Sequence, residues 1–365
     1  MSLAGAALLA LTPAAASAQE TSPPHDQHQS PARDYPSFKL SGFGDVNFAR
    51  TKRVEGARNF FEGQLTLHMT SELSPRTTFF GEISFTPRPD AGTGTPAATG
   101  FNTEVERMIV RFDHSDQLKV SVGRYHTPIN YWNTAFHHGQ WLQTSITRPE
   151  MTQFGGRLLP VHFVGGLVEG SVPAGGLNVN YKAGVGNGRG SVISRGGDHG
   201  DVNSQLAWLV NAFVKPDKLF GLQVGGAVYG DRVTLATSAE FNEHIVSAHA
   251  VWQKENPEVV FEYAAVRHRD RQTGAVAWTP AFYIQVAHRL PFNNELWKPY
   301  VRFEHIDVNA ADAMFAGLPS LDMSTVGLRY DASVFAAVKA EYRTWTRGTG
   351  TPRNHGGFFQ LCFTF

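Results

Sequence analysis

The sequence predicts an all-β protein, a transmembrane antiparallel β-barrel of about 16 strands. Three observations predict this fold. Short segments with alternating apolar and polar residues run from residue 37 to residue 365. Short turns alternate with longer connections between these segments. No stretch approaches the roughly 18 consecutive apolar residues that a membrane-spanning helix needs.

The composition excludes several classes of partner. The chain has 365 residues, and its 32 basic and 32 acidic residues cancel, so no overall field or basic run would attract nucleic acid. Cys362 is the single cysteine, which leaves neither a disulfide framework nor a cysteine-based zinc site. We therefore expect no nucleic-acid partner and no cofactor.

The N-terminus reads as an export signal. Residues 4–11 are apolar, and residues 16–18, Ala-Ser-Ala, match the small-x-small pattern of a cleavage site, although a basic n-region is missing. This predicts a signal peptide over residues 1–18. Residues 19–36 are rich in Pro, His, Ser and Gln, which cannot bury a core, and predict a disordered periplasmic segment. The barrel then occupies residues 37–365.

Alternation with a period of two identifies the strands. The first segment places Leu40, Val46 and Phe48 on one face, with Lys39 and Asp45 on the other. In a helix such neighbours would point to opposite sides, so the segment is a strand. The same alternation recurs along the chain in residues 61–69, 79–85, 177–183, 206–212, 222–228, 282–286 and 359–365.

The connections favour a membrane barrel over a soluble β-sandwich array. Short turns are expected around residues 74–75, 114–115, 173–175, 216–217, 256–257, 291–294 and 331–332. Longer connections are expected at residues 51–58, 87–101, 125–159, 187–202, 231–242, 270–275, 310–320 and 347–355. Strict alternation of this kind places short turns in the periplasm and long loops outside the cell. The predicted location is the bacterial outer membrane, where lipid and lipopolysaccharide would surround the barrel.

Aromatic residues agree with this location. Several fall near strand ends or on outward faces, as interfacial girdles require: Tyr181, Trp252, Tyr263, Trp297, Tyr330, Tyr342 and Trp345. The chain also ends at Phe365, in phase with the outward face of the last strand. That residue resembles the C-terminal signal that the barrel-assembly machinery reads, which makes this machinery an expected partner.

Two stretches carry a family resemblance. Residues 122–128, Val-Gly-Arg-Tyr-His-Thr-Pro, are similar to the Gly-Arg-x-x-x-Pro segment after the fifth strand of phosphate-selective porins. Residues 299–305, Pro-Tyr-Val-Arg-Phe-Glu-His, look like a late strand of the same family. The chain thus resembles the bacterial porin superfamily and, within it, the polyphosphate and phosphate porin type. The resemblance implies a pore for passive diffusion of small hydrophilic solutes or ions, and commonly a homotrimer.

The longest predicted connection is the candidate constriction. A loop as long as residues 125–159 is normally functional and can fold into the lumen to narrow it. Its candidate selectivity residues are His126, Trp132, His137, His138, Trp141 and Arg148. The alternative is that this loop simply packs on the barrel wall.

The polar strand faces supply the candidate pore lining, which comprises Lys39, Arg107, Arg111, Lys119, Lys182, Arg302, Glu304, Arg329, Lys339 and Arg343. Further candidate acids are Asp45, Glu62, Glu82, Glu262 and Glu341. Bases outnumber acids modestly, which leans the pore towards anions. Ion pairs between these groups that only satisfy the wall are the alternative.

The remaining classes are weaker. His137 and His138, like His25 and His28 in the tail, come with neither a nearby cysteine nor a carboxylate in helical spacing, so no metal site is expected. Ser247 and His249 lie two residues apart on one strand face, which is not a Ser/His/acid triad. We therefore do not expect an enzyme. A plugged structural or adhesive barrel is the main alternative to a pore.

Overall fold

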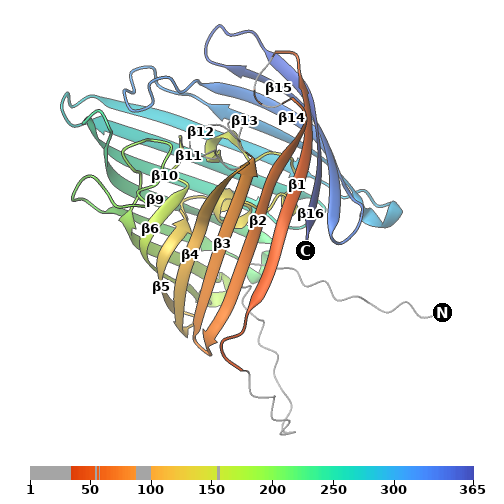
Figure 1. Cartoon of the computed structure of the whole chain (residues 1–365), viewed down its shortest axis with the longest axis horizontal. Helices are drawn as coiled ribbons and strands as arrows, with labels where there is room; N and C mark the ends of the chain where they lie inside the picture. The colour runs from red at the N-terminus through yellow and green to blue at the C-terminus, as the bar shows by residue number, and fades with distance from the viewer. Residues whose placement is uncertain (1–33, 54–55, 57, 88–99, 154–156) are drawn as a thin grey trace.

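The structure is a computed structural model that describes residues 34–53, 56, 58–87, 100–153 and 157–365. Within these ranges, sixteen strands form one closed antiparallel barrel, which confirms the predicted fold class (Figure 1). The predicted signal peptide, residues 1–18, and residues 19–33 of the predicted periplasmic segment lie outside the described residues.

The strands follow one another around the barrel in chain order. They are β1 (Lys39–Thr51), β2 (Asn59–Ser74), β3 (Thr77–Pro87), β4 (Phe101–Ser115), β5 (Leu118–His126), β6 (His162–Val172), β7 (Val179–Asn187), β8 (Ala207–Val214), β9 (Leu222–Thr234), β10 (Glu240–Trp252), β11 (Glu258–Asp270), β12 (Val276–Ala287), β13 (Trp297–Ile306), β14 (Leu321–Asp331), β15 (Ala336–Arg347) and β16 (Asn354–Thr364). The described helices are short: α1 (Tyr131–Ala135) and four 3-10 turns at Glu150–Thr152, Ala174–Gly176, Asp217–Leu219 and Asn293–Glu295. None of them is long and apolar enough to cross a membrane.

The first and last strands close the barrel. The backbone N–H of Gly42 donates to the carbonyl of Phe365 at 2.9 Å, and the N–H of Phe365 donates back at 3.1 Å. A Cβ on Gly42 would come within 2.5 Å of the Phe365 ring. Glycine therefore leaves room for the ring, which lies on the outward face at this seam.

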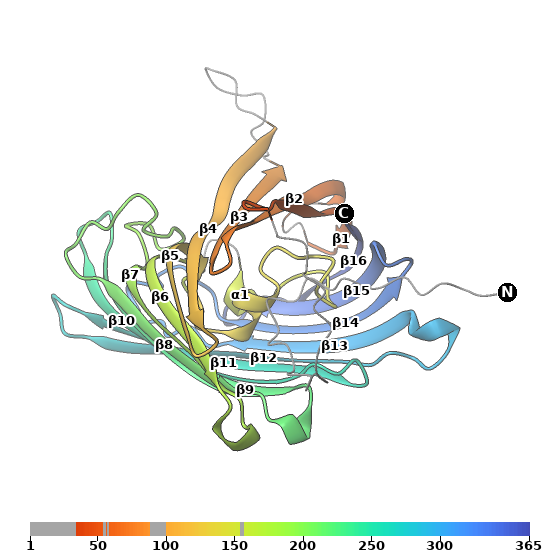
Figure 2. The same cartoon turned by 90° about the horizontal axis from the view of Figure 1, so that it is seen from below.

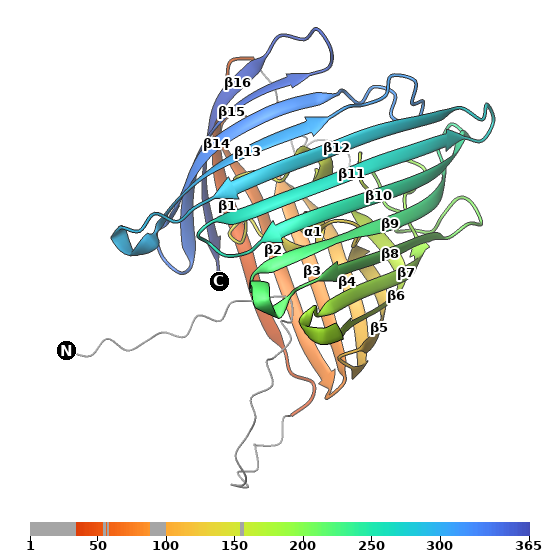
Figure 3. The same cartoon turned by 180° about the vertical axis from the view of Figure 1, so that it is seen from behind.

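The two barrel faces have opposite polarity. On β10, Glu243, Ser247 and His249 are buried on the inner face, whereas Val246 and Ala248 are exposed on the outer face. Figure 3 shows β10 between its neighbours β9 and β11 in the barrel wall. The other strands continue the pattern, so exposed apolar side chains cover the outer face. This inversion of the soluble-protein pattern suits a wall with lipid outside and polar contents inside.

The connections alternate less strictly than the sequence predicts. The turns at residues 75–76 and 116–117 are short, and the β5–β6 connection at residues 127–161 is the longest. The predicted long connection at 231–242 is wrong, however, because β9 and β10 extend into it and leave only residues 235–239. The connection between β12 and β13, predicted as a short turn, spans residues 288–296 and is longer than the β9–β10 connection.

The predicted aromatic girdle needs one correction. Trp297 on β13 packs against Tyr330 on β14 with ring centroids 4.4 Å apart. Trp345, near the end of β15, is only 6% exposed and shares the inner face with Glu341 and Arg343. Its position near a strand end does not predict whether the side chain points inward or outward.

Candidate functional site

A long segment fills much of the barrel interior. The connection between β5 and β6, residues 127–161, is here called the inner loop. Its described residues, 127–153 and 157–161, leave the end of β5, fold into the lumen and return to β6. Figure 2 shows α1, which belongs to this loop, inside the ring of strands. The loop was predicted at residues 125–159; Tyr125 and His126 are instead the last residues of β5.

Hydrogen bonds hold the first half of the inner loop in two places. One is where the two ends of the loop meet, and the other is the wall at β11. The Asn133 side-chain amide donates to the carbonyls of Thr127 at 3.1 Å and Val161 at 3.0 Å, which joins the two ends of the loop. Glu262 accepts hydrogen bonds from the backbone N–H groups of Tyr131 at 2.5 Å and Trp132 at 2.9 Å. Trp132 is therefore buried against the wall, at 1% exposure.

The second half is held by bases on β13, β14 and β15. Arg302 donates to the carbonyl of Thr147 at 2.7 Å and to the Ser145 hydroxyl at 2.8 Å. Arg329 donates to the carbonyl of Trp141 at 2.7 Å. Lys339 donates to the carbonyls of Gln140 at 2.5 Å and Ser145 at 3.0 Å.

Acids on the same wall accept from the loop backbone. Glu341 accepts from the N–H of Ile146 at 2.6 Å, and Glu304 accepts from the N–H of Glu150 at 2.5 Å. Backbone groups inside a barrel cost free energy when they have no partner. The wall charges supply those partners.

Four of the predicted pore-lining residues are covered by the inner loop. Arg302, Glu304, Arg329 and Lys339 lie beneath the inner loop and are at most 7% exposed. Their position on the inner face agrees with the prediction, but their polar atoms contact the loop. Alternation could place these side chains in the lumen, yet could not say what would cover them.

Arg343 lies beside an open space. It forms an ion pair with Glu341 and stacks on Phe358, its guanidinium carbon 3.9 Å from the ring centroid. With Arg347 and Glu150, it lines a cavity of about 510 Å³. Glu150 and Arg347 also form an ion pair at 2.7 Å.

Three further predicted bases lie together on the inner face of β4, β5 and β7. Arg111, Lys119 and Lys182, here called the basic group, surround Glu169 on β6. Arg111 approaches the Glu169 carboxylate to 3.8 Å and Lys182 to 3.3 Å, while Lys119 is its cross-strand neighbour. The side chains of Arg111 and Lys182 are each 28% exposed, so the basic group remains accessible.

The last two predicted lining residues lie elsewhere. Arg107 on β4 forms a 2.5 Å ion pair with Glu82 and stacks over Phe80. Lys39 is exposed at the first position of β1. Neither residue belongs to the basic group.

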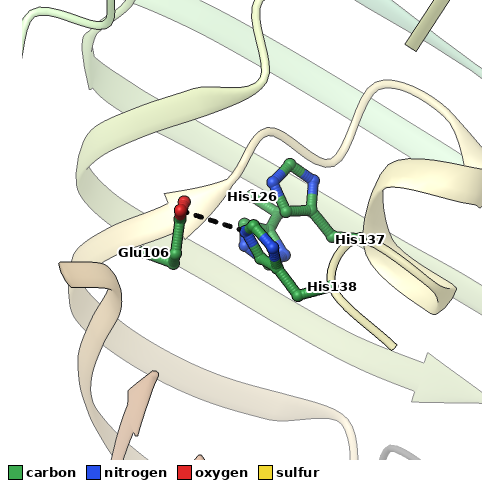
Figure 4. Close-up of side chains that lie close together, drawn as sticks. All are labelled: Glu106, His126, His137 and His138. Carbon is green, nitrogen blue, oxygen red and sulfur yellow. Dashed lines mark ion pairs between the residues drawn. The ribbon is translucent and has the colours of Figure 1, made fainter. Parts of the chain in front are cut away.

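A group of histidines joins the inner loop to the wall formed by β5 and β6. Four histidines, His126, His137, His138 and His162, gather in what we call the histidine cluster. The rings of His126 and His137 stack with centroids 3.6 Å apart, and the His137 and His138 centroids are 4.3 Å apart. His162 lies 5.4 Å from His137 by the same measure. Figure 4 shows three of these rings and Glu106 close together.

Glu106 is the carboxylate that the spacing of the histidines did not reveal. Its Oε1 lies 3.2 Å from Nε2 of His138, and its Oε2 lies 2.8 Å from Nε2 of His162. A β-bulge opposite Glu82 and Ile83 leaves Glu106 without a register partner on β3. Bulges re-aim side chains, and here Glu106 is buried on the inner side next to Arg107.

Burial dominates the electrostatics of the loop side of the cluster. It lowers the pKa of His137 well below its usual value, assisted by neighbouring His126 and Arg148. Burial also lowers the pKa of Arg148 to about 9, although Glu106 and Glu82 act in the opposite direction. The Arg148 guanidinium donates to the carbonyls of His137 and, at 2.9 Å, Thr152.

The remaining predicted loop residue, Trp141, lies half-buried near the Arg329 guanidinium, 5.9 Å from its carbon. Sequence reasoning missed Glu106, His162 and Asn133. No local signal marks them, since Glu106 and His162 come together from two different strands, β4 and β6, and Asn133 bonds to the two ends of its own loop. The pair Ser247 and His249 does not form a catalytic relay, because the Ser247 hydroxyl donates to the carbonyl of Ile129 and His249 contacts Gln223.

Comparison with solved structures identifies the fold. The chain is similar to the anion-selective porin from Comamonas acidovorans, with a TM-score of 0.64 and 12% identity over 90% of this chain and 100% of that chain. The fold is that of a sixteen-stranded porin barrel. The predicted localisation, the bacterial outer membrane, agrees with this fold and with the apolar outer face.

Two further structures share the porin-barrel fold. The outer-membrane channel DcaP of Acinetobacter baumannii matches with a TM-score of 0.59 and 10% identity over 90% of this chain and 97% of that chain. The trimer form of OmpT, an outer membrane protein of Vibrio cholerae, matches with a TM-score of 0.54 and 11% identity over 91% and 100%. No protein-family model matches the sequence, and no curated protein matches it.

Proposed function

We propose that the protein is an outer-membrane porin through which small hydrophilic solutes and ions diffuse passively. The observation that carries this proposal is the polar inner face of a closed sixteen-strand barrel whose outer face is apolar. Barrels of this size have an interior wide enough for an aqueous route. The inner loop then serves as the constriction.

An anion preference is the finer part of the proposal. The basic group places three cations beside two carboxylates, Glu169 and Asp113, on a partly exposed part of the lumen wall. Positive side chains within a low-dielectric wall attract anions. One structurally similar protein is named an anion-selective porin. Phosphate is a candidate solute of this charge class, as the resemblance in sequence implies.

Assembly follows the same proposal. We infer a homotrimer, since one similar outer-membrane protein is described in a trimer form. Lipid and lipopolysaccharide would contact the exposed apolar side chains, and Phe365 would present the C-terminal signal to the assembly machinery.

A plugged barrel is the second candidate function. The observation that favours it is the dense set of hydrogen bonds that hold the inner loop to β11 through β15. A loop fastened this firmly could close the lumen and leave a structural or adhesive barrel.

Liposome swelling separates the two candidates. Purified protein is reconstituted into liposomes that are diluted into isotonic solutions of small sugars or of potassium phosphate. A porin admits the solute, so the liposomes swell at a rate that falls as solute size increases. Liposomes that hold folded, heat-modifiable barrels and yet do not swell would contradict the porin and support the plugged barrel.

A further inference from the structure

We propose that the histidine cluster and Glu106 form a binding site for a divalent transition-metal ion of the Zn²⁺ type, and that this ion fastens the inner loop to the β4–β5 wall. Two ligands, His137 and His138, come from the loop. Two others, Glu106 and His126, come from the wall. The proposal concerns binding alone and does not depend on whether the barrel conducts.

The donor atoms are already close together. One possible ligand atom from each of Glu106, His126, His137 and His138 lies within 4.8 Å of the others (Figure 4). Zinc bonds of about 2.0–2.1 Å place tetrahedral ligands about 3.4 Å apart. Side-chain movements of about 1 Å would thus complete the site. A donor set of three imidazoles and a carboxylate binds Zn²⁺, Cu²⁺ and Ni²⁺ in preference to Mg²⁺ or Ca²⁺.

The loop histidines are oriented as metal ligands usually are. Both amide hydrogens of Asn133 are donated to the backbone carbonyls of Thr127 and Val161. The Asn133 Oδ1 must therefore accept the 2.5 Å hydrogen bond from Nδ1 of His137. This bond places the proton on Nδ1 and the lone pair of neutral His137 on Nε2, the usual arrangement behind a metal ligand.

His138 has a comparable arrangement. Its Nδ1 lies 3.0 Å from Oε1 of Gln64 on β2, and its Nε2 faces Glu106. Gln64, which lies on β2, thus contacts the ring nitrogen of His138 that faces away from Glu106. Such outer partners fix the tautomer and the ring direction of a ligand.

The two wall ligands, Glu106 and His126, offer a buried carboxylate and a ring nitrogen to which a metal ion could bind. Glu106 is 4% exposed, and its nearest partners are imidazole nitrogens, at 3.2 Å for His138 and 2.8 Å for His162, whereas Arg124 is 3.8 Å away. Buried carboxylates are normally paired with a cation or bound to a metal. Nε2 of buried His126 has no hydrogen-bond partner among the described residues, and its ion-pair contact to Glu82 is 3.5 Å long.

A neighbouring set offers an alternative ligand to the same ion. Possible ligand atoms of Glu104, Glu106 and His162 also lie within 4.8 Å of one another. Because Glu106 is common to both sets, the structure favours one ion rather than two. His162 can then complete the coordination or replace one of the other imidazoles.

Zinc retention tests the proposal directly. The barrel is refolded in detergent with excess Zn²⁺, because side chains such as that of His138, at 0% exposure, are closed to solvent in the folded state. The protein is dialysed and its zinc is counted. A variant with His25→Gln and His28→Gln removes the tail histidines, which lie outside the described residues. We expect one retained zinc per chain in both proteins.

Variants locate the ion. His126→Gln combined with His137→Gln should weaken zinc binding at least tenfold. Gln64→Ala, which removes the hydrogen-bond partner of His138 and no ligand, should weaken it about 10- to 100-fold. His249→Gln is the matched control, since His249 is a buried lumen histidine that contacts Gln223 and lies outside the cluster. It should bind zinc like the parent.

X-ray absorption on the zinc-loaded parent protein keeps the test valid if a variant fails to fold. The proposal predicts a four- or five-coordinate shell with scattering from at least two imidazoles. A shell of oxygen ligands, zinc that the cluster variant retains equally well, or a parent that retains no zinc would each overturn the site.

Discussion

Nη1 of Arg302 on β13 donates a 2.7 Å hydrogen bond to the carbonyl oxygen of Thr147 in the inner loop, although 155 residues separate them. The same guanidinium forms a 2.8 Å ion pair with Glu304. A residue predicted to select solutes thus holds the inner loop in place. The wall and the loop act as one unit.

Replacement of Arg302 should therefore loosen the loop. Arg302→Met removes its bonds to Ser145 and Thr147 and leaves Glu304 buried without its cation. Breaking a buried pair in this way costs about 3–5 kcal/mol. We expect lower stability in denaturant titrations and noisier single-channel currents. Arg267→Met is the control, because Arg267 contacts Trp278 and not the loop; equal effects of the two variants would contradict the role of Arg302.

The basic group should set ion selectivity. Lys119→Glu with Lys182→Glu reverses two charges around Glu169, which should move the reversal potential in a salt gradient towards cations. The charge reversal Arg269→Glu, at an exposed position near the end of β11, should leave it nearly unchanged. A reversal potential that ignores the double variant would remove the basic group from the account of selectivity.

The β1–β16 seam should be sensitive to side-chain volume. Gly42→Val would force the Phe365 ring to move, since even a Cβ would lie 2.5 Å from it. We expect a smaller heat-modifiable fraction after refolding. Gly357→Ala on β16 is the matched control, because a Cβ there meets nothing within 4 Å, and it should refold like the parent. Normal refolding of both variants would show that the seam tolerates the displaced ring.

The turn between β10 and β11 should add a small dependence on pH. Burial raises the pKa of Glu255, but Lys298 and Arg289 outweigh this effect, so the pKa lies below that of an ordinary glutamate. A carboxylate with a depressed folded pKa stabilises the protein above its unfolded pKa and loses that contribution as the pH falls through the folded value. Glu255 is 47% exposed, so the effect should stay below about 1 kcal/mol.

Urea titrations in detergent measure this effect. At pH 7 the parent should be slightly more stable than Glu255→Gln, and the difference should be smaller at pH 3. A constant difference at both pH values would show that the ion pairs of Glu255 do not contribute.

The sequence predicts the barrel well because the strand signal is local. Alternation around Asp45 and Asn47 identifies inner residues without reference to any other strand, and both are buried as expected. The length of the inner loop is equally visible. Its partners are not, because Glu341 and Lys339 reach loop atoms almost 200 residues away in the chain.

The histidine cluster shows a second limit. His137 and His138 were recognisable, but Glu106 joins them only because a bulge changes the phase of β4. Strict alternation assigns Glu106 and Arg107 to opposite faces, whereas the structure has Glu106 beside the histidines and Arg107 beside Glu82. A single irregular residue in a strand therefore decides the composition of the site.

Single-channel recording in a planar bilayer with a potassium chloride gradient tests the central claim most directly. The account predicts ohmic current steps from the purified, folded protein, with a reversal potential on the anion side. Membranes that contain the folded barrel and remain electrically silent, in the parent and in Arg302→Met alike, would contradict the pore.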